Sequence, residues 1–136
     1  MRPSIRLLAG FQWFGLLAGA AVWTAQHVVG YGIGQAQCVA GGMHWGIGND
    51  VWQLTLLSCA GLVVVLAEVA AVVVYLATRG ADYGSGPPGS GRFGGRTPYG
   101  RLNFFAMGAM LANALFLAIM LLDGLAASFD VLCRQS

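Results

Sequence analysis

The sequence predicts an all-α membrane protein, with three transmembrane helices forming a single domain over residues 1–136. Apolar residues make up 57% of the chain and charged residues only 9%, which is too few charges for an ordinary water-soluble domain. A spanning helix needs about 20 mostly apolar residues, because the hydrocarbon layer is about 30 Å thick and each helical residue rises about 1.5 Å. Three stretches meet this requirement, at about residues 7–29, 52–78 and 102–129.

The first predicted helix, residues 7–29, follows Arg2 and Arg6, a pattern that is also compatible with a cleavable signal. Its apolar run is longer than a typical signal core, so we interpret it as a permanent anchor. Gly15 and Gly19 form a small-xxx-small pattern, which lets helices approach closely where lipid removes the hydrophobic incentive to associate. This pattern predicts packing either within the bundle or against a neighbouring protein.

The second predicted helix, residues 52–78, carries the ionisable residue Glu68. An ionisable group inside the bilayer is costly, so Glu68 is a candidate functional residue by default. Gln12 and Asn113 lie at comparable depth in the other two helices and are its expected partners. A proton path is one interpretation, whereas a structural hydrogen bond between helices is the commoner one.

The third predicted helix, residues 102–129, repeats the small-residue pattern at Gly108 and Ala112. As in the first helix, the pattern predicts either internal packing or a docking face for a neighbouring protein. Asp123 lies close to the end of this helix. There, partial hydration lowers the cost of a charge.

His27 is expected at the same membrane boundary as Asp123, and the two are predicted to pair with each other or with Gln26. Together with His44, His27 also raises the possibility of a haem or copper ligand, since imidazole binds both. The spacing supports this only weakly, because His44 falls in a predicted loop. We therefore predict no metal site in this chain, and interpret both histidines as polar anchors.

Arginine positions predict the orientation, because short cytoplasmic loops collect basic residues. Six of the seven basic residues fall on one side of the spans (Arg2, Arg6, Arg79, Arg92, Arg96 and Arg101), and only Arg134 falls on the other. The N-terminus and a Gly-, Pro- and Arg-rich loop at 79–101 are then cytoplasmic. The loop at 30–51 and the C-terminus lie outside. The absence of lysine is typical of a GC-rich bacterial genome, so we expect a multi-pass protein of the bacterial plasma (inner) membrane.

The topology predicts that Cys38 and Cys133 lie on the same oxidising side of the membrane. A disulfide between them would join the outer loop to the end of the third helix; the alternative is two separate thiols. Cys59 falls inside the second helix and is interpreted as a small packing residue.

The residue inventory predicts no catalytic residues. Five acids, two histidines and no lysine do not assemble into a catalytic triad, a phosphate-binding loop or a carboxylate pair. No nucleic-acid-binding module is visible either. We therefore expect a chain that is not itself an enzyme and that carries no cofactor of its own.

A series of residues spread along the chain resembles small bacterial multi-helix membrane proteins encoded with haem-copper cytochrome c oxidases. The series is Trp23, His27, Gly30, Tyr31, Cys38, Trp45 and Cys133. The chain departs from the pattern before the loop cysteine, where Gln35, Ala36 and Gln37 replace the usual Pro-Trp. The resemblance implies an accessory or assembly role beside a respiratory oxidase, with haem, copper and electron transfer in partner subunits.

The first functional hypothesis is therefore a non-catalytic accessory subunit of a bacterial respiratory membrane complex, a haem-copper terminal oxidase. Its expected partners are other integral membrane subunits and lipid. The alternatives are an oxidase assembly factor, a homo-oligomeric proton or ion transporter that uses Glu68, and a small haem or quinone protein that uses His27.

Overall fold

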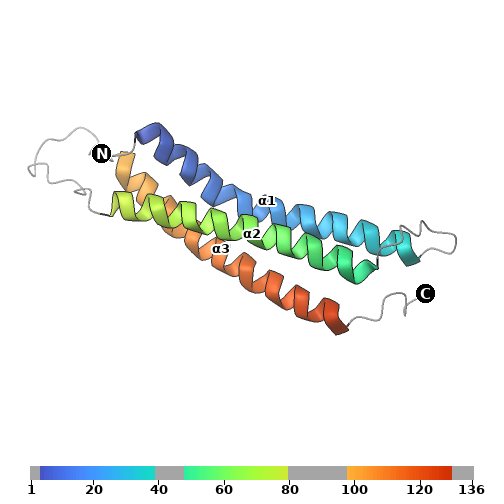
Figure 1. Ribbon diagram of the computed structural model, residues 1–136. Coiled ribbons are helices and arrows are strands. Elements are labelled where there is room, and N and C mark those ends of the chain that lie inside the picture. Colours follow the sequence, from blue (N-terminus) through green and yellow to red (C-terminus); the bar gives the residue numbers. More distant parts are fainter. Residues whose placement is uncertain (1–3, 39–47, 80–97, 130–136) are drawn as a thin grey trace, which may run out of the picture.

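The structure is a computed structural model that describes residues 4–38, 48–79 and 98–129. This part of the chain forms three α-helices and contains no strand: α1 (Ile5–Cys38), α2 (Asn49–Thr78) and α3 (Pro98–Phe129) (Figure 1). Each helix is long and apolar enough to cross a membrane. The all-α class and the three predicted spans are thereby confirmed.

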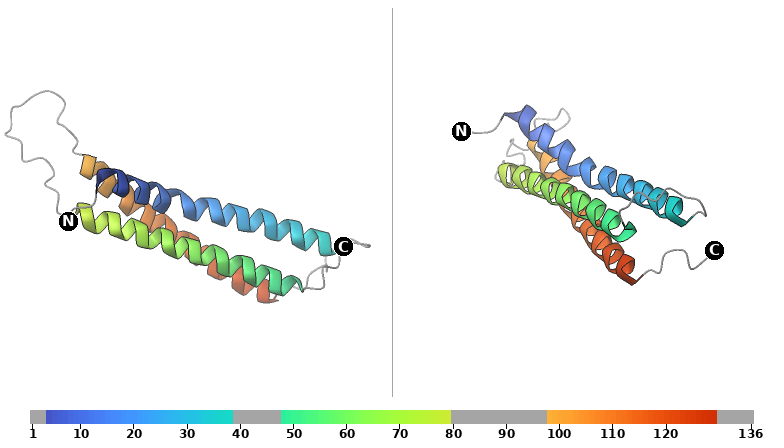
Figure 2. Two further views of the ribbon diagram at one scale, coloured as in Figure 1. Left: turned by 45° about the horizontal axis from the view of Figure 1, so that its top comes forward. Right: turned by 45° about the vertical axis from the view of Figure 1, so that its right-hand side comes forward.

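The helices form an elongated bundle in which α1 and α3 begin at the same end and α2 runs in the opposite direction (Figure 1). We refer to this end as the N-terminal end of the bundle, and to the opposite end as the C-terminal end. In Figure 2, α1 and α2 lie side by side while α3 crosses them obliquely, and its last turns diverge from α1. All three pairs of helices are in contact.

The helix α1 continues to Cys38 rather than ending near Val29, so the first part of the predicted outer loop at 30–51 is helical. Glycine costs about 1 kcal/mol relative to alanine in a helix, but here contacts with α2 favour the helical form. Gly30 is buried and its carbonyl oxygen accepts a 3.0 Å hydrogen bond from Gln53 Nε2, while Ile33 is buried one turn further along.

The connections between the helices lie mostly outside the described residues. These include 39–47 of the predicted outer loop and 80–97 of the predicted cytoplasmic loop at 79–101. The helix α3 begins at Pro98, four residues before the predicted start at 102. Proline suits the first position of a helix, because the N–H that it lacks has no partner there.

Alanine, valine, leucine and methionine side chains fill the core in two apolar clusters. The first consists of Leu8, Val74, Leu102 and Ala106, and the second of Ala60, Val64 and Met120. Between them, Gly15 lies against α2, where a Cβ atom would be 3.1 Å from the Ala67 carbonyl oxygen and 3.3 Å from Ala71 Cβ. Small residues on both helices therefore set this close approach.

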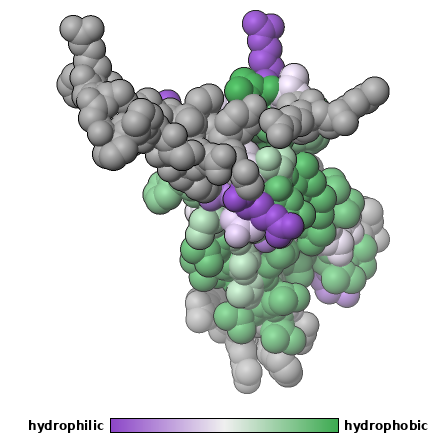
Figure 3. All heavy atoms as spheres, turned by 90° about the vertical axis from the view of Figure 1, so that its left-hand side faces the viewer, coloured by the Kyte–Doolittle hydropathy of each residue, from purple (hydrophilic) through white to green (hydrophobic). Residues whose placement is uncertain are grey.

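The outward faces of the helices are apolar. Figure 3 looks onto the N-terminal end and shows hydrophobic surface over the helix sides, with a few hydrophilic residues interspersed. The most exposed of the large apolar side chains on α3 are Phe104, Leu111, Leu121 and Leu122. Such an exterior suits a lipid environment, in which apolar side chains face hydrocarbon rather than water.

Candidate functional site

Besides the Gln53–Gly30 contact described above, polar side chains meet between the helices at three levels, and the two apolar clusters lie between these levels. The middle level centres on Asn113 of α3, whose Nδ2 atom donates a 2.9 Å hydrogen bond to the Gly15 carbonyl oxygen of α1. Asn113 is only 1% exposed. A Cβ atom on Gly19, one turn after Gly15, would lie 2.5 Å from Asn113 Oδ1. The lack of a side chain at Gly19 therefore makes room for the amide.

Glu68 of α2 joins the same level through an interaction with the side chain of Asn113. Of its two predicted partners, the structure thus places Asn113 beside it. Gln12 is also buried, at 8% exposure, and makes no side-chain hydrogen bond within the described residues. Glu68 Oε2 has no exposed surface and no hydrogen-bond partner in the part of the chain that the structure describes.

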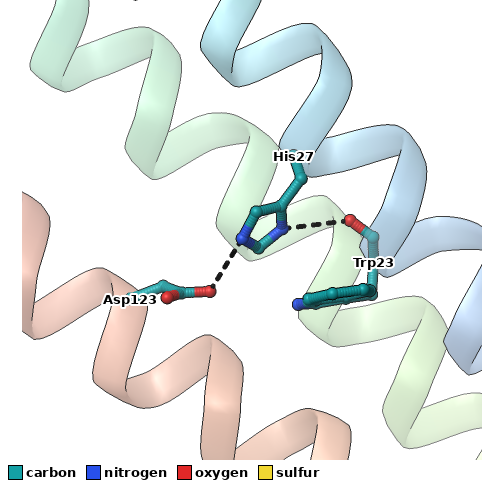
Figure 4. A network of polar contacts seen from close by, with 3 residues as sticks. All are labelled: Trp23, His27 and Asp123. Atoms are coloured by element: carbon teal, nitrogen blue, oxygen red, sulfur yellow. Dashed lines mark hydrogen bonds and ion pairs between the residues drawn. The ribbon is translucent and has the colours of Figure 1, made fainter.

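The level toward the C-terminal end of the bundle, called the outer level below, is the predicted pair of His27 and Asp123. Their Nε2 and Oδ2 atoms lie 3.3 Å apart (Figure 4). The distance is that of an ion pair, without the alignment of a hydrogen bond. The two side chains are 43% and 39% exposed. The His27 ring also contacts the Trp23 ring, with centroids 4.6 Å apart and planes tilted by 48°.

The His27 ring lies between two oxygen acceptors. Its Nδ1 atom is 3.3 Å from the Trp23 carbonyl oxygen, which accepts a hydrogen bond when Nδ1 carries the ring hydrogen (Figure 4). The other ring nitrogen, Nε2, then faces Asp123 Oδ2. This pair joins α1 to α3.

The second apolar cluster separates the middle level from the outer level. Phe116 and Met120 of α3 follow Asn113 by one and two turns, and Asp123 comes in the next turn. Trp23 of α1 packs on Phe116, with ring centroids 5.7 Å apart. Among the described residues, no hydrogen bond or ion pair connects the two polar levels.

The third level, at the N-terminal end, was not anticipated from the sequence. Thr78 is fully buried; its Oγ1 atom donates to the Val74 carbonyl oxygen at 2.8 Å and accepts from Asn103 Nδ2 at 3.2 Å. The sequence could have indicated Asn103 of α3 and Gln53 of α2, because each is an amide side chain within an apolar helix. The partner of each depends on helix rotation, which an apolar pattern does not define.

The remaining predicted residues fall in separate places. Gly108 is exposed and nothing lies within 4 Å of its Cβ position, while Ala112 is half-buried. Cys38 is disulfide-bonded and Cys59 is a free, exposed thiol. Pairing of Cys38 with Cys133 stays a prediction, because Cys133 lies outside the described residues, as do His44 and Trp45.

Comparison with known proteins gives no match to any family model, curated protein or solved structure. The class of the protein therefore rests on its own helices: it is a multi-pass membrane protein with three helices able to span the bilayer.

Proposed function

We propose that this chain is a non-catalytic accessory subunit of a bacterial respiratory membrane complex, a haem-copper terminal oxidase, and that it stabilises the assembly. Haem and copper belong to the partner subunits. The chain adopts the orientation that its arginines favour, with the N-terminal end of the bundle in the cytoplasm and the C-terminal end outside the plasma membrane.

The main support for this proposal is that the polar side chains of the bundle hydrogen-bond neighbouring helices to one another. Asn113, Asn103 and Gln53 each donate a hydrogen bond to a neighbouring helix, and they do so at different depths. Hydrogen bonds of this kind hold helices together where lipid provides no hydrophobic incentive. They favour a fixed scaffold over a passage, because apolar clusters lie between the polar levels.

The direct test is mild-detergent purification of the tagged full-length chain, with mass spectrometry and haem absorption spectra of whatever accompanies it. We expect oxidase subunits in a fixed ratio and a haem spectrum that belongs to them. Purification of the chain alone, without a larger partner, would contradict the proposal. Recovery only with immature complexes would instead identify the chain as an assembly factor.

The exposed face of α3 around Gly108 offers a sharper version of this test. Gly108 and Ala112 form the small-xxx-small pattern, and Gly108 has open space around it, so a neighbouring helix can approach there. We expect Gly108→Leu to reduce co-purification with the complex. Gly10→Leu is the matched control, because Gly10 is equally open but has Arg6 and Phe14 four residues away on either side.

A second candidate function is a homo-oligomeric proton or ion transporter, which the unpartnered oxygen of Glu68 favours. A covered carboxyl oxygen without a partner is costly inside a membrane and marks a site for a proton or a cation. In that case Glu68→Gln abolishes flux into proteoliposomes that contain the purified chain. For a scaffold subunit, the same substitution leaves co-purification with the complex essentially unchanged.

A further inference from the structure

Three arginines mark the N-terminal end of the bundle, one at the end of each helix. Arg6 lies in the first turn of α1, Arg79 directly follows α2, and Arg101 lies in the first turn of α3. All three side chains are exposed. None of them makes a salt bridge with any residue that the structure describes.

No carboxylate on the described helices balances this charge. The first turns of α1 and α3 contain no acidic residue. Asp50 and Asp123 belong to the C-terminal end, and Glu68 lies within the apolar part of α2. By sequence, the stretch 80–97 adds one acid, Asp82, but also two further arginines, so its net charge is positive as well.

The helix lengths place these arginines at a membrane surface. At about 1.5 Å per residue, Arg6 is about 31 Å from His27 along α1, and Arg101 is about 33 Å from Asp123 along α3. Both distances match the roughly 30 Å of a hydrocarbon layer. One lipid boundary then lies at the arginines and the other at the His27–Asp123 pair.

An exposed apolar residue lies within three positions of each arginine in the sequence, toward the middle of the helix. Leu7 is 51% exposed, Leu76 50% and Phe104 72%. An amphiphile with a negative headgroup and apolar tails matches this arrangement, since its headgroup meets the arginines while its tails cover the leucines and the phenylalanine. Arginine is well suited to phosphate, which it binds through paired N–H donors.

We propose that Arg6, Arg79 and Arg101 form a binding site for the phosphate headgroups of anionic phospholipids in the leaflet at the N-terminal end of the bundle. The site is independent of the accessory role, because it requires only the bundle and the surrounding lipid. Its selectivity comes from charge: a zwitterionic lipid brings a cation along with its phosphate, and the three arginines repel that cation.

The test is native mass spectrometry of the full-length chain, released from nanodiscs that contain equal amounts of phosphatidylglycerol and phosphatidylcholine. We expect retained phosphatidylglycerol in clear excess over phosphatidylcholine. An arginine near an anionic surface contributes about fivefold to binding, so Arg6→Gln, Arg79→Gln and Arg101→Gln should each lower phosphatidylglycerol retention about fivefold. The triple variant should lower it about a hundredfold.

Arg134→Gln is the matched control, because it removes the same charge after the end of α3, and it should leave retention unchanged. Circular dichroism checks that the exposed substitutions keep the helices intact. Equal retention of the two lipids would overturn the proposal, as would undiminished retention by the folded triple variant. Displacement of bound lipid by millimolar inorganic phosphate alone would also overturn it, by showing a free-phosphate site.

Discussion

The middle and outer polar levels of the bundle both join α1 to α3, but they do so in different ways. In the middle level, Asn113 is 1% exposed and its amide bonds to a backbone carbonyl oxygen, that of Gly15. In the outer level, His27 and Asp123 are about two-fifths exposed and interact only through their side chains. The first contact needs a glycine at position 19 to form, whereas the second needs only two side chains within reach.

The middle level contributes more to the stability of the fold than the outer level does. A buried amide bonded to backbone fixes both the distance and the rotation of the two helices, because neither partner can move without losing the bond. A partly exposed ion pair is weakened by solvent and by the entropy of its side chains, so it contributes little. We therefore expect substitutions in the middle level to affect stability more than those in the outer level.

The largest effect is expected for Gly15→Leu, which would break the middle level outright. Its side chain would press against the backbone of α2 at Ala67 and Ala71, and backbone cannot give way as a flexible side chain can. Overpacking typically costs about 1 to 3 kcal/mol, and a clash with backbone places this substitution at the upper end, about 3 kcal/mol. Reversible unfolding in mixed micelles would measure the loss. Gly108→Leu provides the control, since that site is open and its stability should be unchanged.

A smaller loss is expected for Asn113→Ala. The substitution removes the hydrogen bond to Gly15 and the interaction with Glu68, and it leaves a small cavity. Interhelical hydrogen bonds in membranes contribute about 0.6 kcal/mol on average and about 1.7 at most, so with the cavity we expect a loss of about 2 kcal/mol. Asn103→Ala, which removes one amide bond to Thr78, is the comparison. An equal loss in both variants would show that the middle level is not special.

In the outer level, a double-mutant cycle of His27→Leu and Asp123→Leu isolates the pair. Exposed ion pairs couple by about 0.2 to 1 kcal/mol, and the two-fifths exposure of both side chains places this pair in that class. The coupling energy is the departure from additivity among the two single variants and the double variant. A coupling above about 2 kcal/mol would reverse the ranking of the two levels.

The smallest effect is expected for Glu68→Gln. The amide keeps the shape of the carboxyl and can still hydrogen-bond the side chain of Asn113, so the free energy of unfolding should change by less than the value of one interhelical hydrogen bond, about 0.6 kcal/mol. Glu68→Lys, which places a positive charge at the same depth, is the contrasting variant and should destabilise the bundle by about 3 kcal/mol. A large loss in Glu68→Gln would show that the carboxyl itself is needed.

Much of this arrangement could be predicted from the sequence, because long apolar runs define the spans and the positions along them define depth. Depth in the membrane was enough to predict that Asn113 lies beside Glu68 and that His27 lies beside Asp123. The continuation of α1 past Gly30 could not be predicted, because it depends on a hydrogen bond from Gln53, which lies 23 residues away. Both the lipid-facing side and the core-facing side of each helix are apolar, so the sequence does not show which side faces the neighbouring helices.

The hydrogen bond from Asn113 to Gly15 joins residues that are 98 positions apart in the chain. During synthesis, α1 and α2 are made before Asn113, and the contact of Gly15 with Ala67 and Ala71 joins these two helices without α3. The two helices can therefore enter the bilayer as a hairpin, while α3 inserts afterwards and closes the bundle. A chain truncated before Pro98 should accordingly integrate into the membrane as a pair of helices, α1 and α2. In that pair the Gly15 carbonyl oxygen lacks the hydrogen bond that Asn113 of α3 donates in the full chain.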